Sequence, residues 1–166
     1  MSNPILIDPI CFARAQQTQR GQFALSAMDE RVLSSLMSTD GDVAWVLTGF
    51  IDDAWRPSLR IELEADVVVA CGYCSEPVAV RLVVDSVLAL FTDESKLAAA
   101  EQDDVSLDAI MVGSELDVMG VMEDEMIMSL PLSPAHSHCG GLDWLRIHRS
   151  RSNPFAILKT IKFPSS

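Results

Sequence analysis

The chain has 166 residues, which is enough for one domain. Hydrophobic residues make up 49% of it and aromatic residues 6%, so it can build a core, and that core must be mostly aliphatic. The formal net charge of −12 at pH 7 repels the phosphate backbone of nucleic acids. This charge disfavours DNA and broad nucleic-acid binding, and it favours a basic protein as a partner.

The N-terminal residues 1–12 carry neither the charged leader nor the long apolar stretch of a signal peptide. No window of the sequence approaches the roughly 18 apolar residues that a membrane-spanning helix needs. We therefore expect a soluble, cytoplasmic protein with no membrane partner. In that compartment the four cysteines are expected to be reduced or metal-bound rather than paired in disulfides.

The first half of the chain predicts strands around one short helix. Residues 1–26 give few signals beyond a short strand at 5–7, and apolar residues at helical spacing predict a helix over 28–37. A strand is predicted over 43–51. Two longer strands, 60–70 and 78–91, alternate apolar and polar residues and are joined by a short turn. This pattern predicts a long antiparallel hairpin.

The second half begins with an acidic segment, 92–108, which we interpret as a loop, either a solvated insertion or a docking site for a basic protein. A helix is predicted over 114–130, capped by Ser114, with a methionine-rich apolar stripe. The residues Glu123-Asp124-Glu125 are placed mainly off that stripe. The tail 146–166 is basic, and Asn153-Pro154 predicts the start of a short amphipathic helix.

These elements together predict a single α+β domain over 1–166. Its core is an antiparallel β-sheet with a long central hairpin, covered by one amphipathic helix, and a short helix ends the chain. The basic tail is expected either to contact RNA phosphate through its arginines or to pack against the acidic surface of the same protein.

The residues Cys71-Gly72-Tyr73-Cys74 stand in the turn of the predicted hairpin and have three interpretations. The spacing matches half of a zinc site, in which two thiolates reach one ion from a tight turn. Cys139 with His136 or His138 would complete it, and the set retained for zinc is Cys71, Cys74, His138 and Cys139. A redox pair is the second interpretation, although redox CxxC motifs start a helix. The third, which we favour on sequence, is a turn that binds no metal.

Signals for catalysis are absent from the sequence. It contains no GxSxG, Walker, GxGxxG or HExxH motif, so we assign no catalytic residue and expect a protein that is not an enzyme. His136 and His138 are interpreted as loop residues. Cys11 is isolated in the sequence and is expected to be buried.

Three stretches carry a resemblance to a known family. They are the residues 65–78 around the CxxC motif, the helix 115–131 with its Glu-Asp-Glu and terminal Leu-Pro, and the ending Asn153-Pro154-Phe155. Together they resemble the YceD family, the large ribosomal RNA subunit accumulation proteins of bacteria and plastids, over about residues 40–162. Two departures stand out: Ser75 follows the second cysteine where many members have glycine, and Cys139 is the single cysteine after the Leu-Pro.

The resemblance implies a ribosome biogenesis factor that supports accumulation or processing of large-subunit (23S) ribosomal RNA. The partners implied are the precursor large subunit, a basic ribosomal protein, ribosomal RNA, or a combination of these. In our hypothesis the acidic segment and the Glu123-Asp124-Glu125 face engage basic protein, and the 146–162 tail contacts RNA or the assembling particle. The alternatives are a zinc-binding RNA-processing hydrolase and a chaperone of a basic ribosomal protein.

Overall fold

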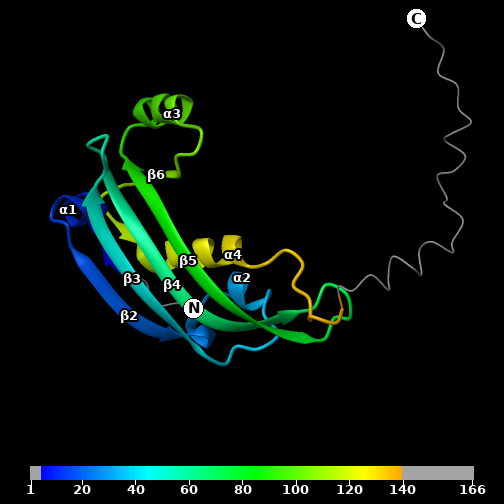
Figure 1. The fold of residues 1–166 in the computed structure, drawn as a ribbon. Helices are drawn as coiled ribbons and strands as arrows, with labels where there is room; N and C mark the ends of the chain where they lie inside the picture. The colour runs from blue at the N-terminus through cyan, green and yellow to red at the C-terminus, as the bar shows by residue number, and fades with distance from the viewer. Residues whose placement is uncertain (1–4, 140–166) are drawn as a thin grey trace, which may run out of the picture.

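A five-stranded sheet forms the centre of the molecule (Figure 1), in a computed structural model that describes residues 5–139. The strand order is β2-β3-β4-β5-β6, and a separate two-stranded sheet pairs β1 with β7. The strands are β1 (Leu6–Ile7), β2 (Thr18–Ala24), β3 (Asp42–Ile51), β4 (Pro57–Ala70), β5 (Pro77–Phe91), β6 (Ala109–Met111) and β7 (Leu116–Asp117). The predicted C-terminal helix and the basic tail 146–166 lie outside the described residues.

The predicted long hairpin is confirmed and dominates the sheet. β4 and β5 pair antiparallel from Ser58↔Ala89 to Ala70↔Pro77. Because successive side chains on a strand point to opposite faces, the alternating sequence buries one face of this hairpin. On that face Leu59, Ile61 and Leu63 are at most 2% exposed. The prediction of an α+β fold around this hairpin is therefore confirmed, and β6 adds a parallel partner at the edge.

Helix α4 (Val118–Ser129) lies on the inner side of the curved sheet, as Figure 1 shows. Its methionines fill the core, with Met119, Met122 and Met126 at most 3% exposed. The cap is Asp117, whose side chain accepts a hydrogen bond from the Met119 amide, so the prediction of Ser114 as cap is wrong. The helix starts later than predicted because Leu116–Asp117 pairs with β1 as strand β7.

The Glu123-Asp124-Glu125 face of α4 is occupied by contacts within the protein. Glu123 is 2% exposed and accepts a hydrogen bond of 2.8 Å from the Asp29 amide, so its placement off the buried stripe is wrong. Asp124 pairs with Arg31 at 2.8 Å. Glu125 accepts a hydrogen bond from the Ser86 hydroxyl on β5. These carboxylates join α4 to its neighbours, and the face is not a free acidic surface.

The N-terminal segment contains more structure than the sequence indicates. Helix α1 (Pro9–Arg14) begins at Pro9 and is capped by Asp8. Strand β2 follows and pairs with β3 at the edge of the sheet. A 3-10 turn, η1 (Leu25–Ala27), leads to α2 (Glu30–Leu33), so the predicted helix over 28–37 is real but shorter.

The prediction of a loop over the acidic segment 92–108 is wrong, because most of this segment forms helix α3 (Glu94–Asp103). The Asp93 side chain caps this helix by accepting hydrogen bonds from the amides of Ser95 and Lys96. None of its residues is buried. In Figure 1 α3 stands at one end of the sheet, and the tip of the β4–β5 hairpin lies at the other end. None of the helices between residues 5 and 139 has the length and apolarity needed to cross a bilayer.

Candidate metal centre

The tip of the β4–β5 hairpin is a tight turn that begins at a buried cysteine. The Cys71 amide donates to the Glu76 carbonyl, and the Ser75 amide donates to the Cys71 carbonyl, both at 2.9 Å. Ser75 has a φ of 62°, in the left-handed region that glycine adopts most easily. Serine in this conformation is strained by about 1 kcal/mol. The hairpin turn nevertheless forms with serine in the position that glycine would occupy without strain.

The segment that follows α4 runs back to this tip and supplies the second half of the site. The Gly72 amide donates to the Pro134 carbonyl at 2.8 Å. The His136 ring bonds the Pro77 carbonyl through Nε2 at 2.9 Å. The Cys139 amide donates to the His136 carbonyl at 3.0 Å, which closes a second short turn. Two turns from distant parts of the chain thus face each other.

Four side chains converge where these turns meet: Cys71, Cys74, His136 and Cys139, whose ligand atoms all lie within 4.8 Å of one another. The Nδ1 atom of His136 is 3.5 Å from the Cys74 sulfur and 3.6 Å from the Cys139 sulfur. The two sulfurs are 3.7 Å apart, so they are not joined by a disulfide.

The separations among the donor atoms of Cys74, His136 and Cys139 match the edges of a zinc tetrahedron. Zn–S bonds of about 2.3 Å and Zn–N bonds of about 2.05 Å give tetrahedral edges of about 3.8 Å between sulfurs and about 3.6 Å between sulfur and nitrogen. The observed values are 3.7 Å for Cys74 to Cys139 and 3.5 Å for Cys74 to His136. The donor set and its spacing therefore fit a metal ion of the size and preference of zinc.

Hydrogen bonds around the site prepare the donor atoms for a metal. Because a carbonyl oxygen can only accept, the His136 bond to Pro77 requires a proton on Nε2 and leaves the lone pair of Nδ1 toward the sulfurs. The backbone amides of Cys74 and Tyr73 lower the pKa of the Cys71 thiol to about 5, so this sulfur is a thiolate at neutral pH.

The pKa values of Cys139 and His136 shift in the opposite direction. Burial and the neighbouring thiols of Cys74 and Cys71 raise the pKa of Cys139 to about 11, so it carries its proton in the metal-free protein. The hydrogen bond to the Pro77 carbonyl is the main cause that raises the pKa of His136. The site without metal therefore holds the stabilised Cys71 thiolate next to a protonated Cys139 thiol.

The structure brings together three residues of the predicted set, Cys71, Cys74 and Cys139, and places His136 rather than His138 with them. The His138 ring stacks on the His136 ring, with centroids 5.2 Å apart. His138 directly precedes Cys139 and lies within the turn that the Cys139 amide closes onto the His136 carbonyl. His136 stands three residues before Cys139, as Cys71 does before Cys74, and that shared spacing is the one sequence signal that favours it over His138.

The structure also bears on the redox interpretation of the CxxC turn and on the expected burial of Cys11. The turn lies between two strands and not at a helix N-terminus, which removes the usual basis for a thioredoxin-type redox pair. Cys11, expected to be buried, is exposed on α1, and a hydrogen bond to Asp8 raises the pKa of its thiol.

A family model and a curated relative that match this chain carry the same description. A family model described as large ribosomal RNA subunit accumulation protein YceD matches residues 59–162, a range that contains all four converging side chains. The chain is also 27% identical to the large ribosomal RNA subunit accumulation protein YceD of Haemophilus influenzae. That alignment covers 96% of this chain and 95% of the relative. No solved structure matches the chain.

Proposed function

Because the chain belongs to the YceD family, we propose that it is a cytoplasmic, non-catalytic factor that supports the accumulation of large-subunit (23S) ribosomal RNA. The observation that carries this proposal is a family match over 59–162, together with a relative of that name aligned along nearly its whole length. The precursor large subunit is the expected site of action.

The geometry of the metal centre supports a structural rather than a catalytic role. A catalytic zinc site keeps one position open for water or substrate, whereas a structural site is closed by four protein ligands. Here four protein side chains, three thiols and one imidazole, already converge. We infer that zinc held by Cys71, Cys74, His136 and Cys139 ties the hairpin tip to the segment after α4.

The metal proposal is tested by comparing two histidines that lie side by side. His136→Asn removes a proposed ligand, and His138→Asn removes the neighbouring ring that stacks on it. We expect purified wild-type protein and the His138 variant to hold one zinc per chain by elemental analysis, and the His136 variant to lose most of it. Equal zinc content in both variants, or none in the wild type, would contradict this ligand set.

The cellular role is tested by deleting the gene and measuring the ratio of 23S to 16S ribosomal RNA together with ribosome sedimentation profiles. We expect a specific loss of large-subunit RNA that the wild-type gene restores. The Cys74→Ser gene should restore it only partly. An unchanged ratio in the deletion strain would refute the proposed function. A purified protein that cleaves precursor rRNA unaided would refute the non-catalytic part.

A chaperone of a basic ribosomal protein is the second candidate, and helix α3 favours it. None of the residues of this helix is buried, and its acids Glu94, Glu101 and Asp103 have no ion pair among the described residues. Opposite charge steers a basic client to such a surface. With these acids changed to their amides, capture of a basic ribosomal protein from a set of purified large-subunit proteins should fall.

The matched control neutralises three exposed acids elsewhere, at Asp42, Asp66 and Glu115. This control has the same net charge as the α3 variant, so it separates local docking from general attraction. Equal losses in both variants would mean that α3 is not the docking surface.

A further inference from the structure

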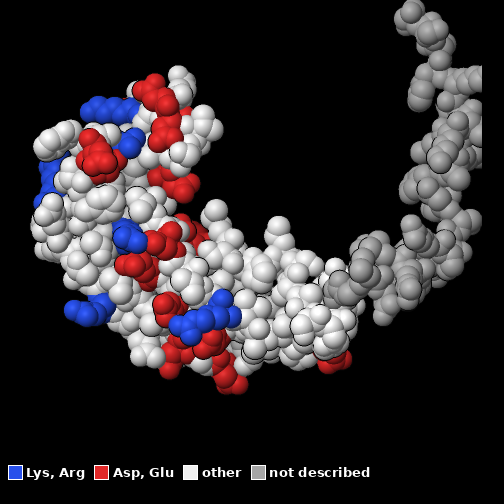
Figure 2. Space-filling model, viewed as in Figure 1, with Lys and Arg blue, Asp and Glu red and all other residues white. Residues whose placement is uncertain are grey.

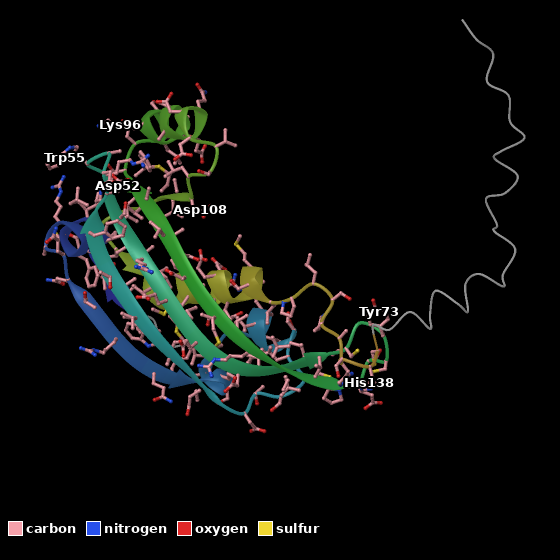
Figure 3. All side chains as sticks on the ribbon, viewed as in Figure 1. Asp52, Trp55, Tyr73, Lys96, Asp108 and His138 are labelled. Carbon is pink, nitrogen blue, oxygen red and sulfur yellow. The ribbon has the colours of Figure 1, made fainter. Side chains whose placement is uncertain are left out.

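A second concave site lies beside the β3–β4 turn, at the end of the sheet near α3. It is a cleft of about 280 Å³ whose walls come from α1, the β3–β4 turn, the end of β5 and α3. Figure 3 shows Trp55 and Lys96 at this end of the molecule, and Tyr73 and His138, which are next to metal-centre residues in the chain, at the other. The cleft is therefore separate from the metal centre.

Cations concentrate at this cleft although the protein is strongly acidic. Arg14, Arg56 and Lys96 line it, and no Asp or Glu does. Arg56 is held by Asp52 at 2.6 Å, whereas Arg14 and Lys96 have no ion pair within residues 5–139. Figure 2 shows Lys and Arg side chains at this end of the molecule, with Asp and Glu side chains beside them. The cleft thus offers two cations without a direct ion pair on a chain with a net charge of −12, although Asp8 lies close enough to Arg14 to interact with it.

The carboxylates of Asp52 and Asp93, which lie beside the cleft, accept hydrogen bonds from backbone amides. The Asp52 side chain accepts hydrogen bonds from the amides of Ala54 and Arg56, at 2.9 and 2.8 Å, and so fixes the turn. The Asp93 side chain caps α3 through the amide of Lys96. These acids therefore set the backbone around the cleft, and Arg56 is the one cation of the cleft that they pair with directly.

The turn that Asp52 fixes presents an indole to solvent at the rim of the cleft. Trp55 is 88% exposed, and its φ of 61° is in the left-handed region that glycine or asparagine occupies at lower cost. Its amide donates to the Asp52 carbonyl at 2.9 Å, so the backbone is held in this conformation. The indole gains almost nothing from burial, and the fold does not need it there. Strain kept at an exposed aromatic residue points to a ligand.

We propose that this cleft binds a nucleotide of single-stranded RNA, with the base stacked on Trp55 and a phosphate between Arg14 and Lys96. A flat exposed aromatic ring beside unpaired cations is the combination that single-stranded nucleic acid recognises. An acidic peptide would use the cations but not the indole face. Because acidic side chains outnumber basic ones over residues 5–139, the contact is local to the cleft within that part of the chain. The choice of RNA over DNA rests on the proposed function.

The test is the affinity of the full-length protein for a fluorescein-labelled oligouridylate of about 12 nucleotides, measured by fluorescence anisotropy. Trp55→Asn suits the left-handed turn and removes the stacking surface, so we expect binding to weaken about tenfold while the melting temperature does not fall. Arg14→Glu with Lys96→Glu should weaken binding and reduce the dependence of log Kd on log salt by about one for each phosphate that the variant no longer binds.

Matched controls are Tyr73→Asn, which removes an exposed aromatic ring at the other end of the molecule, and Arg20→Glu with Arg81→Glu, which makes the same charge change on other exposed arginines. We expect neither to change the affinity more than twofold. The inference is overturned if wild-type protein does not bind at low salt, if the controls weaken binding equally, or if a polyglutamate peptide of the same length displaces the RNA.

Failure of this inference is distinguishable from failure of the proposed function. If deletion of the gene lowers 23S rRNA but Trp55→Asn binds RNA as the wild type does, the cleft assignment falls and the proposed function stands. If deletion leaves 23S rRNA unchanged while Trp55→Asn loses RNA binding, the cleft assignment stands as a single-stranded nucleic-acid site, and its ribosomal role falls.

Discussion

Removal of the buried Glu123 carboxylate should be among the most destabilising substitutions in α4. This side chain is 2% exposed and accepts a 2.8 Å hydrogen bond from the amide of Asp29, the residue that caps α2. Arg31 approaches its other oxygen at 3.5 Å. In Glu123→Ala the amide of Asp29 is left without its acceptor in a partly buried position, and a cavity opens beneath α2.

The magnitude follows from these contacts. A hydrogen bond to a buried charged group contributes about 1.5–3 kcal/mol, and the one missing methylene adds roughly 0.8 kcal/mol. We therefore expect Glu123→Ala to lower the free energy of unfolding by about 2–4 kcal/mol. Glu123→Gln keeps an acceptor and the volume, so its cost should be about 1 kcal/mol. Asp124→Ala breaks an ion pair in which Asp124 is 59% exposed, which is expected to cost less than about 1 kcal/mol.

The assay is urea unfolding followed by circular dichroism, with the same m-value required for all three variants. For a chain of 166 residues, each kcal/mol corresponds to roughly 2–4 °C in melting temperature, so thermal unfolding provides a check. If Glu123→Ala were no more destabilising than Asp124→Ala, the carboxylate would not be serving the α2–α4 contact. The face would then again be available as an acidic docking surface.

The remaining predictions concern the core and the metal centre. A Cβ at Gly49 would lie 2.7 Å from the Phe12 carbonyl oxygen, so Gly49→Ala should destabilise by about 1–3 kcal/mol in urea unfolding, whereas Gly113→Ala, with nothing within 4 Å, should not. Chelation of zinc should lower the melting temperature of the wild type and leave Cys74→Ser unchanged, and an equal response of both proteins would contradict a stabilising metal. In metal-free protein the pKa of Cys71 is lowered from its usual 9.0 to about 5, so this thiolate contributes stability that is complete above pH 9 and lost as the pH falls through about 5. Absorbance at 240 nm should accordingly show a thiolate at neutral pH that Cys71→Ser lacks, and identical titrations of the two proteins would rule it out.

Much of the fold is predictable because its signals are local. The alternation of apolar and charged residues along β4 and β5 can be recognised in each strand's own sequence, without knowledge of its neighbours in the sheet. This alternation predicts both the hairpin and the position of the CxxC turn. β2 gives no such signal because it is an edge strand that is exposed along nearly all of its length. The sequence of helix α3 predicts a loop because none of its residues is buried, so it has no apolar stripe to find.

Local sequence patterns are sufficient for the family, the α+β class, the central hairpin and three of the four converging metal-centre residues. The three-dimensional arrangement is needed to show that His136 completes the group, because the direction of a side chain depends on the turn it belongs to. It is also needed to show that Glu123 is buried, because the Asp29 amide that it bonds lies 94 residues away in the chain. Both results depend on contacts between distant segments, which a local pattern does not contain.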